Sequence, residues 1–185
     1  DMHGDFLKET LIRAGINTDN LIQDEKYFTT LAFVSLKENG EREFAFARKP
    51  GADTKLCMKE IDPEILENTR VFHVGSLSLT DDPSRTATYE AINIARNSGA
   101  VISYDPNYRA ALWSDPETAQ LRMQSLIPYV DMMKISDEET SLLTPYQDPE
   151  EAIQYLLRQG VHLVAVTLGR DGALIGNENG IVKAE

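Results

Sequence analysis

Short apolar runs recur along the second half of the chain at a spacing of about thirty residues, as in strand–helix–strand units. They begin at Val71, Val101, Met132 and Leu163, and helical patterns of apolar residues lie between them. Repeated units of this kind form a mainly parallel sheet flanked by helices. The pattern therefore predicts an α/β fold.

Turn and cap residues indicate where the elements begin and end. Asp82-Pro83 and Asp148-Pro149 each pair an acidic N-cap residue with proline at the first helical position, and a further helix follows Trp113-Ser-Asp-Pro116. Gly180 opens a run that is typical of another strand. These signals place helices between the predicted strands and add a last strand to the sheet.

The first part of the chain follows a different pattern. Its opening helix carries one apolar face and is closed by a C-cap glycine; the residues concerned are Phe6, Leu7, Thr10, Leu11, Ala14 and Gly15. No strand precedes this helix in the sequence, so we expect that material upstream is missing.

Two β-rich segments, Tyr27 to Lys37 and Glu43 to Ala47, enclose Asn39-Gly40, a dipeptide typical of a tight hairpin. Phe44 and Phe46 alternate with alanines, so one face of the hairpin is aromatic. An isolated hairpin is marginally stable in water, so this one should lie against something. We interpret residues 27–48 as a β lid over an α/β core formed by residues 1–26 and 49–185. A dimer contact and an extra sheet at the domain edge are the alternatives.

Composition narrows the classes of function. The formal net charge of the 185 residues is −12, which disfavours nucleic acid and anionic membrane as partners. Cys57 is the only cysteine, and no apolar run is long enough to span a bilayer. We therefore expect a cytoplasmic protein without disulfides. His3, His73 and His162 are far apart in sequence, which disfavours a histidine metal site.

Polar residues at alternate positions follow the strand that begins at Val101. Asp105, Asn107 and Arg109 point the same way if the segment is extended, as Pro106 favours. Ligands of open α/β sheets bind beyond the carboxyl ends of the strands, and an arginine beside an amide suits a multiply charged oxygen group. The alternative is a solvated turn in which Asp105 accepts backbone amides.

Two further segments follow predicted strands. Ser136-x-x-Glu139 is a capping box before a helix, and its acidic cluster is also suited to hydrated Mg²⁺. Thr167-Leu-Gly169-Arg-Asp-Gly172 forms either an anion-binding nest of amides or a hairpin turn to the next strand. Neither segment matches a Walker A or dinucleotide-binding pattern.

Taken in order, these segments resemble the PfkB (ribokinase-like) carbohydrate kinase family, and most of all its fructokinase branch. The resemblance is carried by the following segments: the Asn-Gly hairpin with Phe46-Ala-Arg48-Lys-Pro-Gly-Ala-Asp53, Phe72-His-Val-Gly-Ser-Leu77, Asp105-Pro-Asn-Tyr-Arg109 with Leu112-Trp113, Ser136-x-x-Glu139 and Thr167-Leu-Gly-x-x-Gly172. No single motif is specific, but the ordered set is, and it spans nearly the whole chain. The family fold is a parallel sheet flanked by helices, with a small β lid.

The resemblance implies an ATP- and Mg²⁺-dependent kinase that phosphorylates a hydroxymethyl group of a small sugar, with fructose as the expected sugar. The implied sugar contacts are Arg48, Asp105 and Asn107, while Arg109 would face the sugar or the transferred phosphoryl group. Glu139 would hold the Mg²⁺ region through water. The residues implied to line the ATP site are Ser136, Thr167, Gly169 and Gly172. Many relatives carry asparagine where this chain has Ser136.

Two motifs of the family are missing from these 185 residues. They are the sugar-binding Gly-Gly near the amino terminus and the Gly-Ala-Gly-Asp stretch that supplies the anion hole and the catalytic base. We therefore expect an internal fragment of a kinase that does not phosphorylate sugar by itself. Alternative substrates are 2-keto-3-deoxygluconate and ribose. A non-catalytic sugar or nucleotide sensor and a domain that dimerises through the hairpin are the alternatives of another class.

Overall fold

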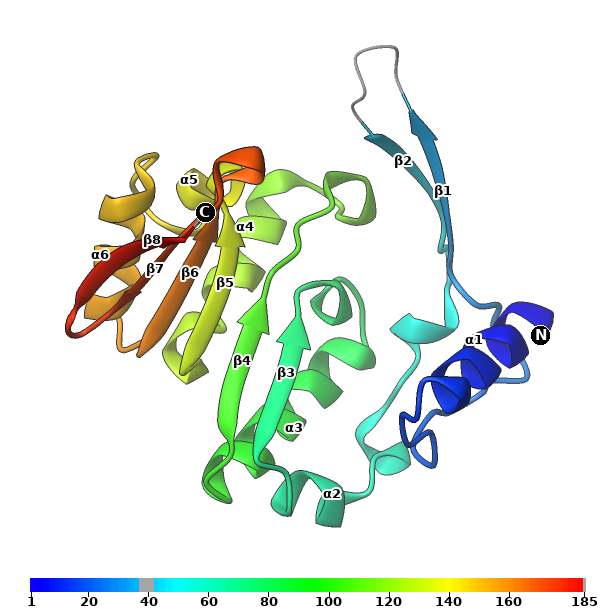
Figure 1. The fold of residues 1–185 in the computed structure, drawn as a ribbon. Helices are drawn as coiled ribbons and strands as arrows, with labels where there is room; N and C mark the ends of the chain where they lie inside the picture. Colours follow the sequence, from blue (N-terminus) through cyan, green and yellow to red (C-terminus); the bar gives the residue numbers. More distant parts are fainter. Residues whose placement is uncertain (37–41, 185) are drawn as a thin grey trace.

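The computed structural model describes residues 1–36 and 42–184, and its main feature is a six-stranded sheet (Figure 1). Its strand order follows the chain: β3 (Val71–Gly75), β4 (Val101–Asp105), β5 (Met132–Ser136), β6 (Leu163–Thr167), β7 (Ala173–Asn177) and β8 (Gly180–Ala184). The first four strands are parallel, whereas β7 and β8 pair antiparallel. The predicted start of each parallel strand and the predicted last strand are confirmed.

Helices pack on one face of this sheet, as Figure 1 shows. They are α3 (Ser84–Asn97), α4 (Pro116–Gln124), α5 (Thr140–Leu143) and α6 (Pro149–Arg158), while the short α2 (Pro63–Glu67) precedes β3. The strand side chains beneath them, such as Ile102 and Ile135, are fully buried. The opposite face is open, with Val71 55% exposed. The predicted mainly parallel α/β fold is confirmed.

The helix caps explain where the covering helices start. Asp148 accepts a hydrogen bond from the backbone N–H of Glu151, as predicted for an N-cap aspartate. The prediction for Asp82 was wrong, because the N-cap position of α3 is occupied by Pro83. Asp82 Oδ1 accepts from the hydroxyl of Thr86 at 2.8 Å and from the backbone N–H of Thr86 at 3.3 Å, so its carboxylate still lies at the first turn of the helix.

The amino-terminal part consists of α1 (Met2–Arg13) and a two-stranded antiparallel hairpin of β1 (Leu31–Leu36) and β2 (Arg42–Ala47). α1 lies beside the base of the hairpin and buries none of its residues (Figure 1). Phe44 and Phe46 stack on one face of β2, with ring centroids 6.1 Å apart, as the alternation predicts. The Asn39-Gly40 turn lies outside the described residues. The division into lid and core stays a prediction.

Within residues 1–36 and 42–184, no helix has the length and apolar character needed to cross a membrane.

Candidate active site

The predicted site residues come together at the carboxyl edge of the parallel strands. Gly75 pairs with Asp105 at the ends of β3 and β4, and Ser136 pairs with Thr167 at the ends of β5 and β6. A cavity of about 450 Å³ lies elsewhere, between α1 and the base of the hairpin. A smaller one, of about 300 Å³, lies at this edge, lined by His73, Gly75, Ser76, Leu77, Ser78, Asp105, Pro106 and Asn107. We take the second as the candidate site because two of the predicted sugar contacts, Asp105 and Asn107, line it.

The segment from Asp105 to Arg109 leaves β4 in a turn, so the predicted extended conformation was wrong at Asn107. Hydrogen bonds from backbone amides fix this turn. Asn107 adopts a φ of 47°, a left-handed conformation that asparagine tolerates better than most residues. Asp105 Oδ1 accepts from the N–H of Asn107 at 3.1 Å, and the N–H of Ser76 donates to the carbonyl of Pro106 at 3.2 Å. Asp105 thus accepts a backbone amide, as the solvated-turn alternative expects, and it also lines the cavity.

Glu139 joins this turn to the end of the next strand. Its Oε2 accepts from the N–H of Ser136 at 2.8 Å, and its Oε1 accepts from the N–H of Tyr108 at 2.7 Å. The predicted capping box is present, and the residue is only 7% exposed. Sequence gives no signal for the second bond, because Tyr108 is 31 residues away. One buried carboxylate therefore sets the distance between the two polar segments.

Lys134 is a site residue that sequence reasoning missed. Its Nζ lies 3.3 Å from Asp105 Oδ2, on the open face of the sheet. The available signal was a lysine inside the apolar run Met132-Met-Lys-Ile135, two residues from Ser136. Both side chains are partly exposed, so this ion pair contributes little to stability. Its effect is to place a positive charge beside the cavity.

Arg109 connects the turn to the hairpin. Its Nη1 donates a hydrogen bond to the carbonyl of Tyr108 at 2.8 Å. The carbon of its guanidinium lies 5.3 Å from the centroid of the Phe44 ring. A cation above an aromatic ring at this distance is attracted by the π electrons. The aromatic face of β2 therefore contacts Arg109 of the predicted site.

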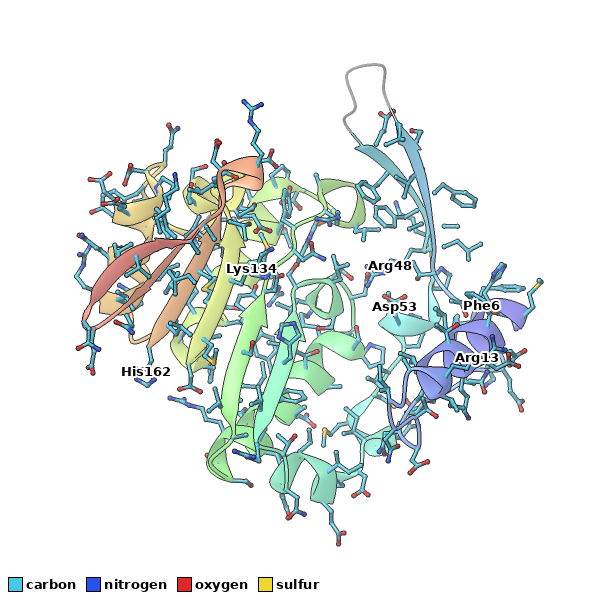
Figure 2. The ribbon with its side chains drawn as sticks, viewed as in Figure 1. Phe6, Arg13, Arg48, Asp53, Lys134 and His162 are labelled. Carbon is cyan, nitrogen blue, oxygen red and sulfur yellow. The ribbon has the colours of Figure 1, made fainter. Side chains whose placement is uncertain are left out.

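Arg48 reaches the site region from the end of β2, but its hydrogen bonds go to protein groups. It binds Asp53, the hydroxyl of Thr80 and the carbonyl of Leu77, and its side chain is 4% exposed. Figure 2 shows Arg48 and Asp53 at the base of the hairpin. Sequence reasoning missed these partners, and the predicted contact between Arg48 and sugar stays a prediction.

Gly169 and Gly172 lie in a tight turn after β6, with φ values of 58° and 89°. Both conformations are left-handed and favour glycine. The N–H of Leu168 donates to the carbonyl of Gly172 at 2.8 Å, and the chain then returns as antiparallel β7, as the alternative of a turn between two strands expects. Thr167 and Ser136 lie beside this turn because their strands are in register. The four predicted nucleotide-site residues are thus neighbours.

Tyr104, on β4 next to Asp105, is a buried ionisable residue beside the site. Burial raises the pKa of Tyr104 well above its usual range, with the negative charge of Glu139 as a further cause, so this phenol stays neutral.

Within the described part of the chain, no group of three or more His, Cys, Asp or Glu residues could hold a metal ion. Mg²⁺ usually keeps several waters and binds through one or two carboxylates plus substrate phosphates. Glu139, which accepts two amides, retains lone pairs for a metal-bound water, so the site fits that mode.

Comparison with known proteins places these features in context. The family described as "pfkB family carbohydrate kinase" matches residues 1–185. Fructokinase-1 of Zea mays is 39% identical over 173 residues, which cover 93% of this chain and 54% of that protein. Probable fructokinase-3 of Arabidopsis thaliana is 38% identical over 173 residues, or 93% of this chain and 50% of its own length. The chain thus spans about half the length of these curated relatives.

Two solved structures of fructokinases align with the whole length of this chain. Fructokinase from Vibrio cholerae O395, in a form that binds fructose, ADP and calcium ion, aligns with a TM-score of 0.90 at 34% identity over 100% of this chain and 59% of that one. Fructokinase from Xylella fastidiosa with bound ATP aligns with a TM-score of 0.87 at 30% identity, again over 100% and 59%.

Proposed function

Because the chain belongs to the pfkB family of carbohydrate kinases, we propose that it supplies the lid, the sugar-binding turn and part of the nucleotide site of an ATP-dependent fructose kinase. The reaction transfers the γ-phosphoryl group of ATP to a hydroxymethyl group of fructose. The proposal combines the family with the arrangement of this chain's own residues. The likeness to fructokinases favours fructose among the sugars.

One observation carries the proposal. The turn from Asp105 to Arg109 lies at the carboxyl edge of the sheet, beneath the aromatic face of the hairpin, and Glu139 joins it to the segment after β5. Phosphoryl transfer depends mainly on positioning and electrostatic stabilisation. A sugar-binding turn and a phosphate-side segment held by one buried carboxylate provide such positioning.

Each polar group of the turn has a proposed role. Asp105 accepts hydrogen bonds from sugar hydroxyls, and Asn107 accepts from and donates to them. Both residues line the cavity. The guanidinium of Arg109 stabilises negative charge that develops on the transferred phosphoryl group, or binds the sugar next to it. Lys134 adds positive charge beside Asp105. The general base is not assigned to any residue of this chain.

The nucleotide binds at the ends of β5 and β6 in this proposal. Ser136 and Thr167 offer hydroxyls, and the turn containing Gly169 and Gly172 allows close approach of the phosphates to the backbone. Glu139 holds Mg²⁺ through water. The bound ion would neutralise charge on the phosphates, while the residues of the chain orient them.

The assay described below also tests three alternatives. 2-Keto-3-deoxygluconate and ribose kinases are the nearest other activities, and a sugar sensor would bind without turnover.

We also propose that the protein is cytoplasmic, binds neither nucleic acid nor membrane, and forms a homodimer through the hairpin. The hairpin carries exposed apolar side chains, with Phe33 60% exposed, which favours a contact on that surface.

The experiment is a coupled assay of the protein as its own cell makes it, with ATP and Mg²⁺. Fructose, 2-keto-3-deoxygluconate and ribose are compared under identical conditions, and binding of each is measured by calorimetry. We expect the highest kcat/KM with fructose. Arg109→Ala should lower kcat/KM by about 10²–10³-fold, as loss of a transition-state donor does. Glu139→Gln should raise the Mg²⁺ requirement, whereas Arg13→Ala on the surface of α1 should change neither.

The outcomes separate the alternatives. Highest kcat/KM with another sugar would replace fructose. Binding of fructose without turnover in the protein from its own cell would contradict the kinase and favour the sensor. Full activity of Arg109→Ala would remove that residue from the site.

A further inference from the structure

Arg48 is a buried charge whose three partners come from two separate segments. Its Nε donates to Asp53 Oδ2 at 2.8 Å, its Nη1 to Thr80 Oγ1 at 2.9 Å, and its Nη2 to the carbonyl of Leu77 at 2.7 Å. Asp53 belongs to a 3₁₀ turn after the hairpin, while Leu77 and Thr80 follow β3. A buried guanidinium is tolerated only when its donors are paired, so these partners must stay in place. Arg48 therefore attaches β2 to the core.

The other leg of the hairpin is attached at the same place. The hydroxyl of Thr30, directly before β1, donates to the second oxygen of Asp53. The N–H of Ala52 donates to the carbonyl of Phe28 at 2.9 Å. One carboxylate thus joins both legs of the hairpin, and Arg48 ties that carboxylate to the turn after β3.

Gly51 shows that the cluster is closely packed. A Cβ at this position would lie 2.1 Å from Thr30 Oγ1, 2.6 Å from Asp53 Oδ1 and 3.0 Å from Arg48 Cγ. The φ of Gly51 is −91°, which any residue can adopt, so space alone requires glycine here. Thr54 completes the cluster by donating from its hydroxyl to the carbonyl of Gly51 at 2.8 Å.

Burial sets this cluster apart from its surroundings. Within residues 1–36 and 43–60, the only buried residues are Arg48, Gly51 and Thr54. None of these three residues has a large apolar side chain that could form a hydrophobic core. The attachment of the hairpin therefore depends on hydrogen bonds of this cluster and on the contact between Phe44 and Arg109.

We infer that Arg48, Asp53 and Thr80 form a latch that fixes the orientation of the lid, and that Arg48 is a positioning residue that acts through β2. Phe44 lies four residues before Arg48, about 13 Å along an extended strand. A change of angle at Arg48 therefore displaces the Phe44 ring from Arg109. The inference rests on the proposed function only for what the lid covers. The latch itself is a property of the described contacts.

The test measures the orientation of the lid directly, in the absence of substrates. Spin labels are placed at Ser35 on β1 and Glu117 on α4, two exposed positions, in a Cys57→Ser background. Double electron–electron resonance then gives the distance distribution between lid and core. The labelled protein is mixed with an excess of unlabelled protein, so that only distances within one chain are measured. We expect a single narrow peak for the parent, and its loss in Asp53→Asn and in Gly51→Ala. The first variant removes the charge that holds Arg48, and the second forces the cluster apart without changing any charge.

Two controls make the result interpretable. Arg13→Ala removes an exposed arginine whose ion pair with Glu9 lies on α1, and it should leave the peak unchanged (Figure 2). Circular dichroism establishes that each variant is folded. An unchanged narrow peak in folded Asp53→Asn and Gly51→Ala would overturn the latch, whether or not the protein phosphorylates fructose.

A kinetic comparison separates positioning from direct contact. If Arg48 acts through the latch, Asp53→Ala should lower kcat/KM for fructose as much as Arg48→Ala, and the double variant should lose no more than either alone. Additive losses, or a loss confined to Arg48→Ala, would contradict the inference and favour a direct bond to the sugar.

Discussion

The sheet and the amino-terminal sixty residues are held together by different forces. In the sheet, the buried side chains are apolar, and Ile102, Ile135 and Val164 are fully enclosed. In the amino-terminal part, the residues described as buried belong to the polar cluster around Arg48, while Phe28 is 74% and Phe33 60% exposed. Hydrophobic burial is non-directional, whereas hydrogen bonds fix angles. The sheet therefore supplies stability, and the cluster supplies the orientation of the lid.

This difference suits the roles of core and lid in the proposed function. Lids that close over substrates are drawn from the less stable parts of a protein. A hairpin with few buried apolar contacts can move at low cost once its polar attachment is altered. The turn of Asp105 to Arg109, by contrast, is fixed to the stable sheet through Ser76 and Glu139. The molecule thus joins a turn that is fixed to the sheet to a hairpin of adjustable position, and in the proposed function these are the sugar-binding turn and the lid.

The largest expected effect tests the two kinds of stabilisation directly. Ile135→Ala removes a fully buried side chain from β5 and should destabilise the protein by about 2–5 kcal/mol. Phe33→Ala, in the exposed hairpin, should change the free energy of unfolding of the monomer, measured at protein concentrations where no dimer forms, by less than about 0.5 kcal/mol. Urea unfolding followed by circular dichroism measures both. Equal losses would mean that the hairpin has an apolar core of its own.

A smaller effect is expected from a helix cap in the sheet region. Asp115 accepts from the N–H of Thr118 at 2.7 Å, and this bond, with those from Ser114 and Thr118 hydroxyls, lowers the pKa of its carboxyl. A carboxyl whose folded pKa is lowered stabilises the fold at pH values above its unfolded pKa. That contribution is lost as the pH falls through the folded pKa.

Asp115→Asn should therefore reduce the dependence of the melting temperature on pH in the acid range and leave the lid unaffected. Thermal melts of parent and variant between acid and neutral pH measure the effect. A steeper pH dependence in the variant would contradict the assigned cause.

The sheet was predictable because its signals are local. Each parallel strand is a short apolar run, and Ser136-x-x-Glu139 forms the predicted capping box. The sequence also predicts that Asp105, Ser136 and Thr167 lie near one another, because neighbouring parallel strands end at the same edge of a sheet. The prediction that Asp82 is an N-cap was wrong because an Asp-Pro pair does not by itself fix the residue at which the helix begins.

Other contacts could not be read from the sequence. The bonds from Arg48 to Thr80 and from Glu139 to Tyr108 span 32 and 31 residues and depend on how separate turns approach each other. Lys134 meets Asp105 only because β4 and β5 are neighbours. The sequence shows that Arg48 precedes a Pro-Gly turn, but whether its guanidinium faces a ligand or a carboxylate is decided by tertiary structure.

Residue-resolved hydrogen exchange under native conditions tests the central claim most directly. Amides of Ile102 and Ile135 in the sheet should exchange only through global unfolding, whereas amides of β1 and β2 should exchange by a local opening of lower free energy. Asp53→Asn should accelerate exchange in the hairpin alone. Equal protection in both regions, lost together in the variant, would show that lid and sheet open as one unit and would contradict the account.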